Sequence, residues 1–321
     1  MHHFTLIFVS FVLNIFSSDA QGIYEMTWST IGIKGKVKEI TQRSYGVQFK
    51  FGELEKNQSE ISDGYAHYIF NEKGFATEYG LGNKQIIEYN ELGNKISQTM
   101  FANREDKSEY LYKKIIWKYD NNGKIVEQNE YDKDGNLTRK DLYKYDKNGK
   151  LSQFIDYDKD GNFSRKFLYK YDKNGNPVEN SAYDENDTLV SKTLYKYDSD
   201  KKLIEYTSYR KFGNSKWGSI ENSKSIYKYD KSGNLLQNTT QVNTQDVISK
   251  KTTSKMKLET YKYNDKSEMI EYTSGIPNDT KSTKTIKYEY DSYSNWIKAI
   301  VLNNTSSDFK NSIKEREIIY Y

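Results

Sequence analysis

The 321-residue sequence contains no cysteine, only two prolines and only three histidines. The absence of cysteine excludes disulfide bridges, thiolate zinc sites, cysteine nucleophiles and a lipid anchor at a lipobox. So few prolines also exclude a collagen-like chain. Tyrosine alone supplies 30 of the residues in the 35% hydrophobic share, so the remaining apolar content is lean for a globular protein.

A strong charge imbalance is also missing. Charged residues make up 29% of the chain, yet 49 basic and 45 acidic side chains leave a net charge of only +4. Charge-driven disorder and highly basic nucleic-acid binders both need a lopsided balance. We therefore expect an ordered protein without a nucleic-acid partner, although the alternating Lys and Tyr of YKY could physically contact a single strand.

A long apolar run occurs only at the N-terminus, between Phe4 and Phe16. It is too short for a membrane span of about 20 residues, but it suits the apolar region of a secretory signal. Ser18 and Ala20 place small residues where a signal peptidase reads its site. The sequence predicts a signal peptide over residues 1–20, cleaved after Ala20, and a secreted or periplasmic protein without a membrane span.

An internal repeat dominates the rest of the sequence. The anchor YKYD, or a close variant, ends at Asp120, Asp146, Asp172, Asp198, Asp230, Asn264 and Asp291, and the first four of these anchors are 26 residues apart. A second set begins halfway between them, with YDKDGN at 131–136 and 157–162, YDENDT at 183–188 and YRKFGN at 209–214. A fixed period of this kind is typical of repeat architectures.

The repeat unit predicts a β-hairpin. Each anchor ends in Asp-Lys-Asn-Gly or a close variant, with the residue types that a type I turn favours at its first and fourth positions. The segments between turns alternate with a period of two and are rich in Tyr, Phe and Thr, which indicates strands. We therefore expect an all-β fold, a long antiparallel meander of YD-type hairpin repeats.

The turns also predict the strand register, if the residues before and after each turn pair one by one in order. Tyr145 should then face Leu151, and Tyr143 should face Gln153. The odd-numbered residues would form one Tyr-, Leu- and Phe-rich surface, opposite a surface of Lys, Ser and Asp. Turn spacings that alternate between 12 and 14 residues shift successive hairpins, and more than about 20 strands exceed what an open twisted sheet holds. We expect the meander to coil into a spiral, an open barrel or a shell.

The domain organisation follows from the repeat. N-terminal strands over residues 21–65 lead into a YD-like repeat domain over 66–321, with insertions near 211–224 and 241–257 that break the regular period. Insertions in a rigid scaffold often carry binding residues. Trp217, in the first insertion, is our preferred contact residue, and a tolerated surface insertion is the alternative.

The whole pattern resembles a known group. The YxYDxxGx(L/I) unit resembles the YD repeats of the Rhs class, and GKVKEITQRSY, FGELEK, NWIK and the closing KEREIIYY resemble secreted Rhs-repeat-like proteins of the Bacteroidetes. The resemblance covers about residues 35–321. It implies a β-strand spiral and an exported location, with no assigned biochemistry. Large relatives build shells around a toxin segment, whereas we expect no separate toxin domain after Trp296.

Two sets of residues are candidates for binding. A stripe of tyrosines could stack on sugar rings or hold another protein, or it could be the core of a Tyr-rich sheet. The candidate ligand-binding residues are Trp217, Tyr143, Tyr169, Tyr195 and Tyr227. Acidic turn residues could ligate calcium, although turn geometry alone explains them; these are Asp132, Asp134, Asp158 and Asp160.

Catalysis is not expected. A Ser-His-Asp arrangement would have to use His67, which lies in a predicted strand, and the acids are dispersed over turns rather than paired as in a glycosidase. No cofactor or zinc motif is present. We expect an exported, non-enzymatic β-repeat protein that presents a structural or protein-interaction surface at the cell envelope. A glycan-binding module, and a companion or remnant of an Rhs-type toxin-delivery shell, are the alternatives.

Overall fold

The computed structural model describes residues 27–50, 53–60, 65–80, 83–103, 108–213, 218–277, 282–304 and 311–321. Within these residues it contains 21 strands and no helix. The strands are β1 (Val37–Lys50), β2 (Glu53–Glu60), β3 (Ala66–Phe70), β4 (Ala76–Gly80), β5 (Lys84–Tyr89), β6 (Lys95–Asn103), β7 (Glu109–Tyr119), β8 (Ile125–Asp132), β9 (Leu137–Tyr145), β10 (Leu151–Asp158), β11 (Phe163–Tyr171), β12 (Pro177–Tyr183), β13 (Leu189–Tyr197), β14 (Leu203–Gly213), β15 (Gly218–Tyr229), β16 (Leu235–Asp246), β17 (Thr252–Tyr263), β18 (Met269–Gly275), β19 (Ser282–Tyr290), β20 (Trp296–Asn303) and β21 (Ser312–Tyr320).

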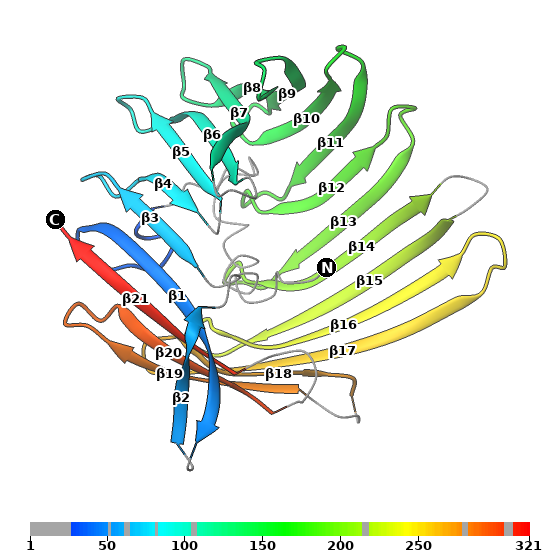
Figure 1. Cartoon of the computed structure of the whole chain (residues 1–321). Coiled ribbons are helices and arrows are strands. Elements are labelled where there is room, and N and C mark those ends of the chain that lie inside the picture. The colour runs from blue at the N-terminus through cyan, green and yellow to red at the C-terminus, as the bar shows by residue number, and fades with distance from the viewer. Residues whose placement is uncertain are drawn as a thin grey trace. The chain divides into compact units, whose positions relative to one another are not determined.

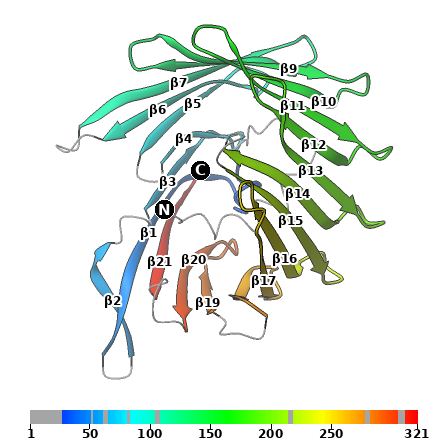
Figure 2. The same cartoon turned by 90° about the vertical axis from the view of Figure 1, so that its right-hand side faces the viewer.

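The chain forms two compact units. The first contains residues 117–129 and 137–257, and the second contains the described residues of 25–116, 130–136 and 258–321. In the first unit each strand from β9 to β16 pairs antiparallel with the next along the chain (Figures 1 and 2). In the second unit β1 pairs with both β3 and β21, so the earliest long strand and the final strand of the chain are neighbours. The prediction of an all-β antiparallel meander is confirmed.

The turns form as the sequence predicts, as the turn after β9 illustrates. The carboxylate Oδ1 of Asp146 accepts hydrogen bonds from the backbone N–H of Asn148 (2.9 Å) and Lys150 (2.8 Å). The N–H of Gly149 donates to the Asp146 carbonyl at 2.9 Å, and Gly149 has a φ of 76°. A positive φ is what the fourth turn position requires, and glycine adopts it without a steric penalty.

Lys201 occupies this same turn position with a φ of 64° although it is not glycine. We expect Lys201→Gly to raise the free energy of unfolding by about 0.5–1 kcal/mol, since it removes a left-handed Cβ clash. Urea unfolding measures the change. Lys147→Gly, at a turn position without a positive φ, is the matched control and should lower stability slightly. A Lys201→Gly protein that unfolds at lower urea than the wild type would contradict this explanation.

The predicted register is correct at the turns and wrong beyond them. Tyr145 pairs with Leu151 as expected, but Tyr143 pairs with Phe154 rather than Gln153, because Ser152 is an extra residue on β10. The next hairpin repeats the pattern, with an extra residue at Ser164 of β11. Each such β-bulge falls at the second residue of the strand that follows a turn and reverses the odd–even parity of that strand. The odd-numbered surface is therefore replaced by one on which parity alternates from strand to strand.

The bulges create two distinct faces on the first unit. The tyrosine face contains Tyr143, Phe154, Phe167, Tyr169, Tyr195, Tyr206 and Tyr227. Cross-strand rings meet on this face, with centroid separations of 5.2 Å for Tyr143–Phe154 and 5.3 Å for Phe154–Phe167. The lysine face, opposite, contains Lys140, Leu142, Lys144, Lys166, Leu168, Lys170, Lys192, Leu194, Lys196, Lys224, Ile226 and Lys228.

The second tyrosine of each YKY anchor ties neighbouring hairpins together. In the first unit the Tyr145 hydroxyl donates to the Ile125 carbonyl at 2.6 Å. The same bond recurs from Tyr171 to Leu151, from Tyr197 to Pro177 and from Tyr229 to Leu203. A repeated bond of this kind adds a nearest-neighbour term to the stability of each repeat.

The second unit has a compact apolar core. Val37, Ile40, Phe70 and Ala76 are each at most 2% exposed, and they pack together with Ile33. Trp28 packs against this cluster, and its indole N–H donates to the Val37 carbonyl at 2.7 Å.

The two insertions lengthen hairpins. Residues 211–213 and 218–224 belong to β14 and β15, which pair as far as Gly213 and Gly218, and residues 241–246 and 252–257 extend β16 and β17. Trp217 and the predicted signal peptide lie outside the described residues. Within the described ranges, the structure has no helix long and apolar enough to cross a bilayer.

Candidate functional site

The four predicted tyrosines lie together on the tyrosine face. Tyr143, Tyr169, Tyr195 and Tyr227 occupy equivalent positions of β9, β11, β13 and β15. Tyr143 is only 8% exposed, and burial raises its pKa. Burial also raises the pKa of Tyr169 to about 12. The buried ring of Tyr143 therefore contributes to the packing of the sheet. Tyr169, Tyr195 and Tyr227 remain partly exposed.

The acidic turn residues use their oxygens within the turns. Oδ1 of Asp158 accepts the backbone N–H of Asp160 and of Asn162, both at 2.9 Å, and Oδ2 accepts the Asn162 side-chain amide at 3.1 Å. Asp160 instead contacts Lys159 at 2.8 Å. Asp132 and Asp134 repeat this arrangement in the second unit. In the described residues no group of three or more acidic or histidine side chains is placed to hold a metal ion.

His67, the one histidine of the predicted mature chain, lies on β3 between two carboxylates. Its Nε2 is 3.0 Å from Oε1 of Glu39, and its Nδ1 is 3.9 Å from Oε1 of Glu78. These contacts place the His67 ring between acidic side chains of the two neighbouring strands.

A buried polar cluster on the tyrosine face was not predicted. Asp141 and Asp156 face each other across β9 and β10 and are 1% and 4% exposed. Arg139 bridges them, with its Nε 2.8 Å from Asp141 and 3.2 Å from Asp156, and Arg165 lies 3.4 Å from Asp156. The Gln128 amide donates to Asp141 at 3.0 Å. One feature of the sequence pointed to this cluster: Asp141 occupies the position at which the next repeat has Phe167.

The lysine face carries a regular pattern of charge. Each of β9, β11, β13 and β15 presents Lys-x-(Leu or Ile)-x-Lys, because alternate residues of a strand share a face. Glutamates on the intervening strands bridge these lysines in pairs. Glu179 contacts Lys170 at 3.0 Å and Lys192 at 3.1 Å. Glu205 likewise contacts lysines on both neighbouring strands, at 2.7 and 3.0 Å.

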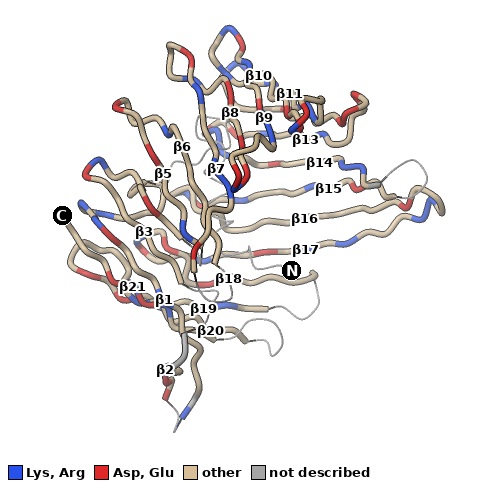
Figure 3. Tube along the Cα trace, turned by 45° about the horizontal axis from the view of Figure 1, so that its top comes forward, with Lys and Arg blue, Asp and Glu red and all other residues tan. Residues whose placement is uncertain are grey.

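The pairing of charges on the lysine face is incomplete. At the positions equivalent to Glu179, β10 and β16 carry Gln153 and Gln237, which face Lys144 and Lys228. Within the described residues, Lys144 and Lys228 form no ion pair. Figure 3 shows basic and acidic positions interspersed along β13 to β15. The lysine face therefore has a surplus of positive charge.

Exposed aliphatic side chains lie among these lysines. Leu194 is 42% exposed and Ile226 is 43% exposed, and each lies between two lysines of its own strand. The lysine face thus combines a lysine surplus with apolar side chains open to solvent.

Comparisons with known proteins add only structural likeness. The sequence matches no protein-family model and no curated protein. Among solved structures, 42 chains are similar. Chains of the TcdB2-TccC3-TEV and TcdB2-TccC3 crystal structures are each 14% identical, with TM-scores of 0.42, over 86% and 87% of this chain. This chain spans only 15% and 16% of their length.

A porin-like protein from Bacteroides uniformis ATCC 8492 is also similar. It is 10% identical, with a TM-score of 0.34, over 89% of this chain and 97% of its own. At these identities and TM-scores the matches assign no family to this chain, and the sequence resemblance to Rhs-type proteins of the Bacteroidetes remains a prediction.

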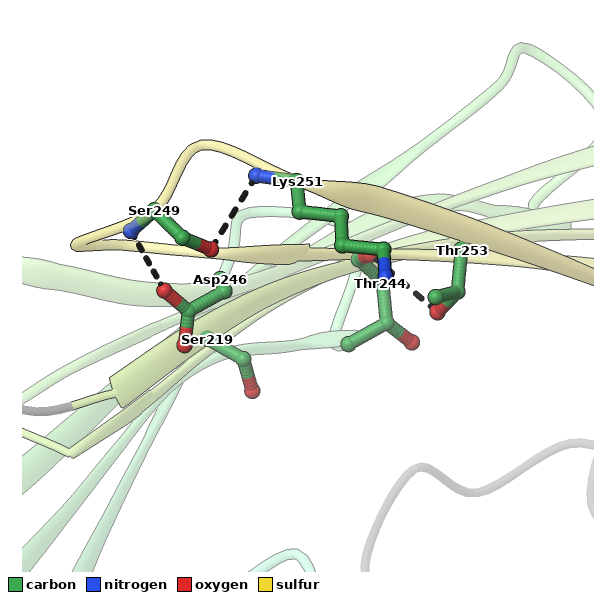
Figure 4. Close-up of a pocket in the computed structure, with 6 residues that line it drawn as sticks. All are labelled: Ser219, Thr244, Asp246, Ser249, Lys251 and Thr253. Atoms are coloured by element: carbon green, nitrogen blue, oxygen red, sulfur yellow. Dashed lines mark hydrogen bonds between the residues drawn. The ribbon is translucent and has the colours of Figure 1, made fainter.

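A shallow pocket lies at the end of the β16–β17 hairpin (Figure 4). Its volume is about 310 Å³, and it is lined by Ser219, Thr244, Asp246, Ser249, Lys251 and Thr253. Its polar groups bond to one another: the Ser249 N–H donates to Asp246 at 2.6 Å, and the Lys251 N–H donates to the Ser249 hydroxyl at 3.3 Å. These contacts build the turn.

Several carboxylates that are hydrogen-bonded in the folded protein should make its stability fall at acid pH. The Lys118 hydrogen bond holds the pKa of Glu127 at about 2, and hydrogen bonds from Asn162 and from Lys196 lower the pKa of Asp158 and of Glu205. Because the folded-state values are depressed, this stability is present above about pH 4.5 and is lost as pH falls toward 2. We expect the urea midpoint to be lower at pH 3 than at pH 6.

Glu127→Gln provides the control for this pH dependence. It removes one depressed carboxyl, so the difference between the two midpoints should shrink. A midpoint that stays level or rises between pH 6 and pH 3 would contradict the assignment.

Proposed function

We propose that the chain is an exported, non-enzymatic β-repeat protein whose lysine face binds the acidic surface of a protein partner at the cell envelope. The observation that supports this proposal most directly is the repetition of Lys-x-(Leu or Ile)-x-Lys on one face of four alternating strands. The proposal treats the repeats as a scaffold and the lysine face as the site.

Charge favours an acidic partner. Eight lysines lie on this face of β9, β11, β13 and β15, while glutamine replaces glutamate at two of the facing positions. The positive surplus steers a negatively charged surface toward the face. Salt screens exposed charges. These lysines therefore contribute more to the orientation of the partner and to the rate of encounter than to the affinity of the complex.

The aliphatic residues of the lysine face supply apolar contact area, which the lysines alone do not provide. Leu194 and Ile226 are large and more than 40% exposed. Leu194 and Ile226 lie among the lysines, and an apolar centre within a polar rim is typical of a protein interface. We infer that a partner covers these side chains and places carboxylates beside Lys144 and Lys228.

A pair of charge-reversal variants tests the proposal. Lys144→Glu with Lys228→Glu reverses the two unpaired lysines of the face, and Lys147→Glu with Lys231→Glu makes the same charge change at exposed turns. Each protein is immobilised, exposed to an envelope extract, and its bound proteins are quantified by mass spectrometry. We expect recovery of an acidic partner to fall at least tenfold with the face pair and less than twofold with the turn pair. Equal recovery from both variants would overturn the proposal.

A further inference from the structure

The polar pocket at the end of the β16–β17 hairpin has a fixed framework. Ser219 of β15 pairs with Asp246 of β16, so their side chains lie on the same face. Thr244 lies on this face too, because alternate residues of a strand point to the same side. The Val247 N–H donates to the Gly218 carbonyl at 3.0 Å, which fastens the turn to the start of β15. Two paired strands therefore hold three polar side chains on one side of the hairpin.

Several polar groups of this pocket have no partner in the protein. Among the described residues, no carboxylate lies within 4 Å of the Lys251 ammonium, and the half-buried hydroxyls of Ser219 and Thr244 form no hydrogen bond. Figure 4 shows the Lys251 side chain extending from the turn toward Thr244 and Thr253. The Asp246 carboxylate lies on the turn side of the pocket in the same view. An ammonium donor and two hydroxyls are therefore available to a ligand.

The Asp246 carboxylate provides an acceptor at the turn side of the pocket. Its Oδ1 accepts the backbone N–H groups of Ile248 at 3.1 Å and of Ser249 at 2.6 Å. Hydrogen bonds from Ser249 are the largest cause of the lowered pKa of Asp246. The ionised carboxylate can only accept hydrogen bonds, and it repels other anions. A ligand should therefore place hydroxyl groups beside Asp246 and any negative charge beside Lys251.

We propose that this pocket binds a sugar acid, a ring that carries several hydroxyl groups and one carboxylate. The Lys251 ammonium pairs with the ligand carboxylate in a charge-assisted hydrogen bond. The hydroxyls of Ser219, Thr244 and Thr253 can donate and accept, as ring hydroxyls do, and Asp246 accepts from a ring hydroxyl. The volume of about 310 Å³ is at the lower end of the range for small-molecule sites and suits a single ring. All six lining side chains are polar, which favours a hydroxylated ligand over an apolar one.

Isothermal titration with sodium D-galacturonate, at constant ionic strength, tests the site. We expect saturable binding to the wild type, at least fivefold weaker binding to Lys251→Gln and to Ser219→Ala, and affinity within twofold of the wild type for Lys255→Gln. Lys255 is the matched control, because it is exposed and lies four residues further along β17, outside the pocket. Both lysine variants should unfold at the urea concentration of the wild type, since both side chains are exposed.

Two analogues separate the contributions of the carboxylate and the hydroxyls. Methyl β-D-galactoside lacks the carboxylate and sodium acetate lacks the ring hydroxyls, so each should bind at least tenfold more weakly than galacturonate. Trigalacturonate, titrated in parallel, distinguishes the sources of the ligand: tighter binding indicates the end of an acidic polysaccharide, and equal or weaker binding indicates a free sugar acid. The proposal is overturned if galacturonate binding does not saturate, if Lys251→Gln and Lys255→Gln lose affinity equally, or if either analogue binds as tightly as galacturonate.

Discussion

Arg139→Ala is expected to destabilise the protein by roughly 3–5 kcal/mol, since it removes the positive charge that lies between two buried carboxylates. Asp141 and Asp156 are 1% and 4% exposed, and the Arg139 Nε lies 2.8 Å from Asp141 and 3.2 Å from Asp156. Urea unfolding of the variant measures the loss.

Lys159→Ala is the control, because it removes a cation whose ion pair with Asp160, at 2.8 Å, lies in an exposed turn. Its stability should lie within about 0.5 kcal/mol of the wild type, as for most surface ion pairs. A loss of less than about 1 kcal/mol in Arg139→Ala would mean that this arginine does not stabilise the buried carboxylates.

Phe70→Ala is expected to lower the free energy of unfolding by about 3–5 kcal/mol, the usual cost of emptying a buried aromatic site. Phe70 is 2% exposed and packs among Val37, Ile40 and Ala76 in the core of the second unit. Collapse around the vacated space is restricted, because Val37 and Ala76 lie in paired strands and the Trp28 indole is held by the Val37 carbonyl. The urea midpoint at unchanged slope gives the size of the effect.

Leu92→Ala provides the comparison for the core substitution. Leu92 is 85% exposed, so its truncation removes little buried area and should change stability by less than about 0.5 kcal/mol. Similar losses in the two variants would show that the cluster around Phe70 is not the main core of the second unit.

The hairpin pattern was accessible from the sequence because its determinants are local. Asp146 and Gly149 specify a turn through hydrogen bonds and a positive φ, and the strands between turns alternate with period two. The bulge at Ser152 was not accessible in the same way, since no residue type marks it. A single extra residue then changed which side chains share a face, and the odd-numbered surface predicted from the turns was wrong.

The candidate sites show the same division. The tyrosines of YKY were identified from their repetition, but their burial depends on packing that periodicity does not reveal. Lys144 and Lys228 are ordinary members of the repeat in sequence, and they stand out only because Gln153 and Gln237 face them.

Photo-crosslinking from adjacent residues tests the central claim most directly, because Leu194 and Tyr195 lie on opposite faces of β13. A photoreactive phenylalanine analogue is placed at Leu194 or Ile226 on the lysine face, and in matched variants at Tyr195 or Tyr227. Each variant is irradiated in the envelope extract. The account predicts adducts with an acidic protein from 194 and 226 and none from 195 and 227. Adducts from 195 and 227 alone would contradict it and would identify the tyrosine face as the contact surface.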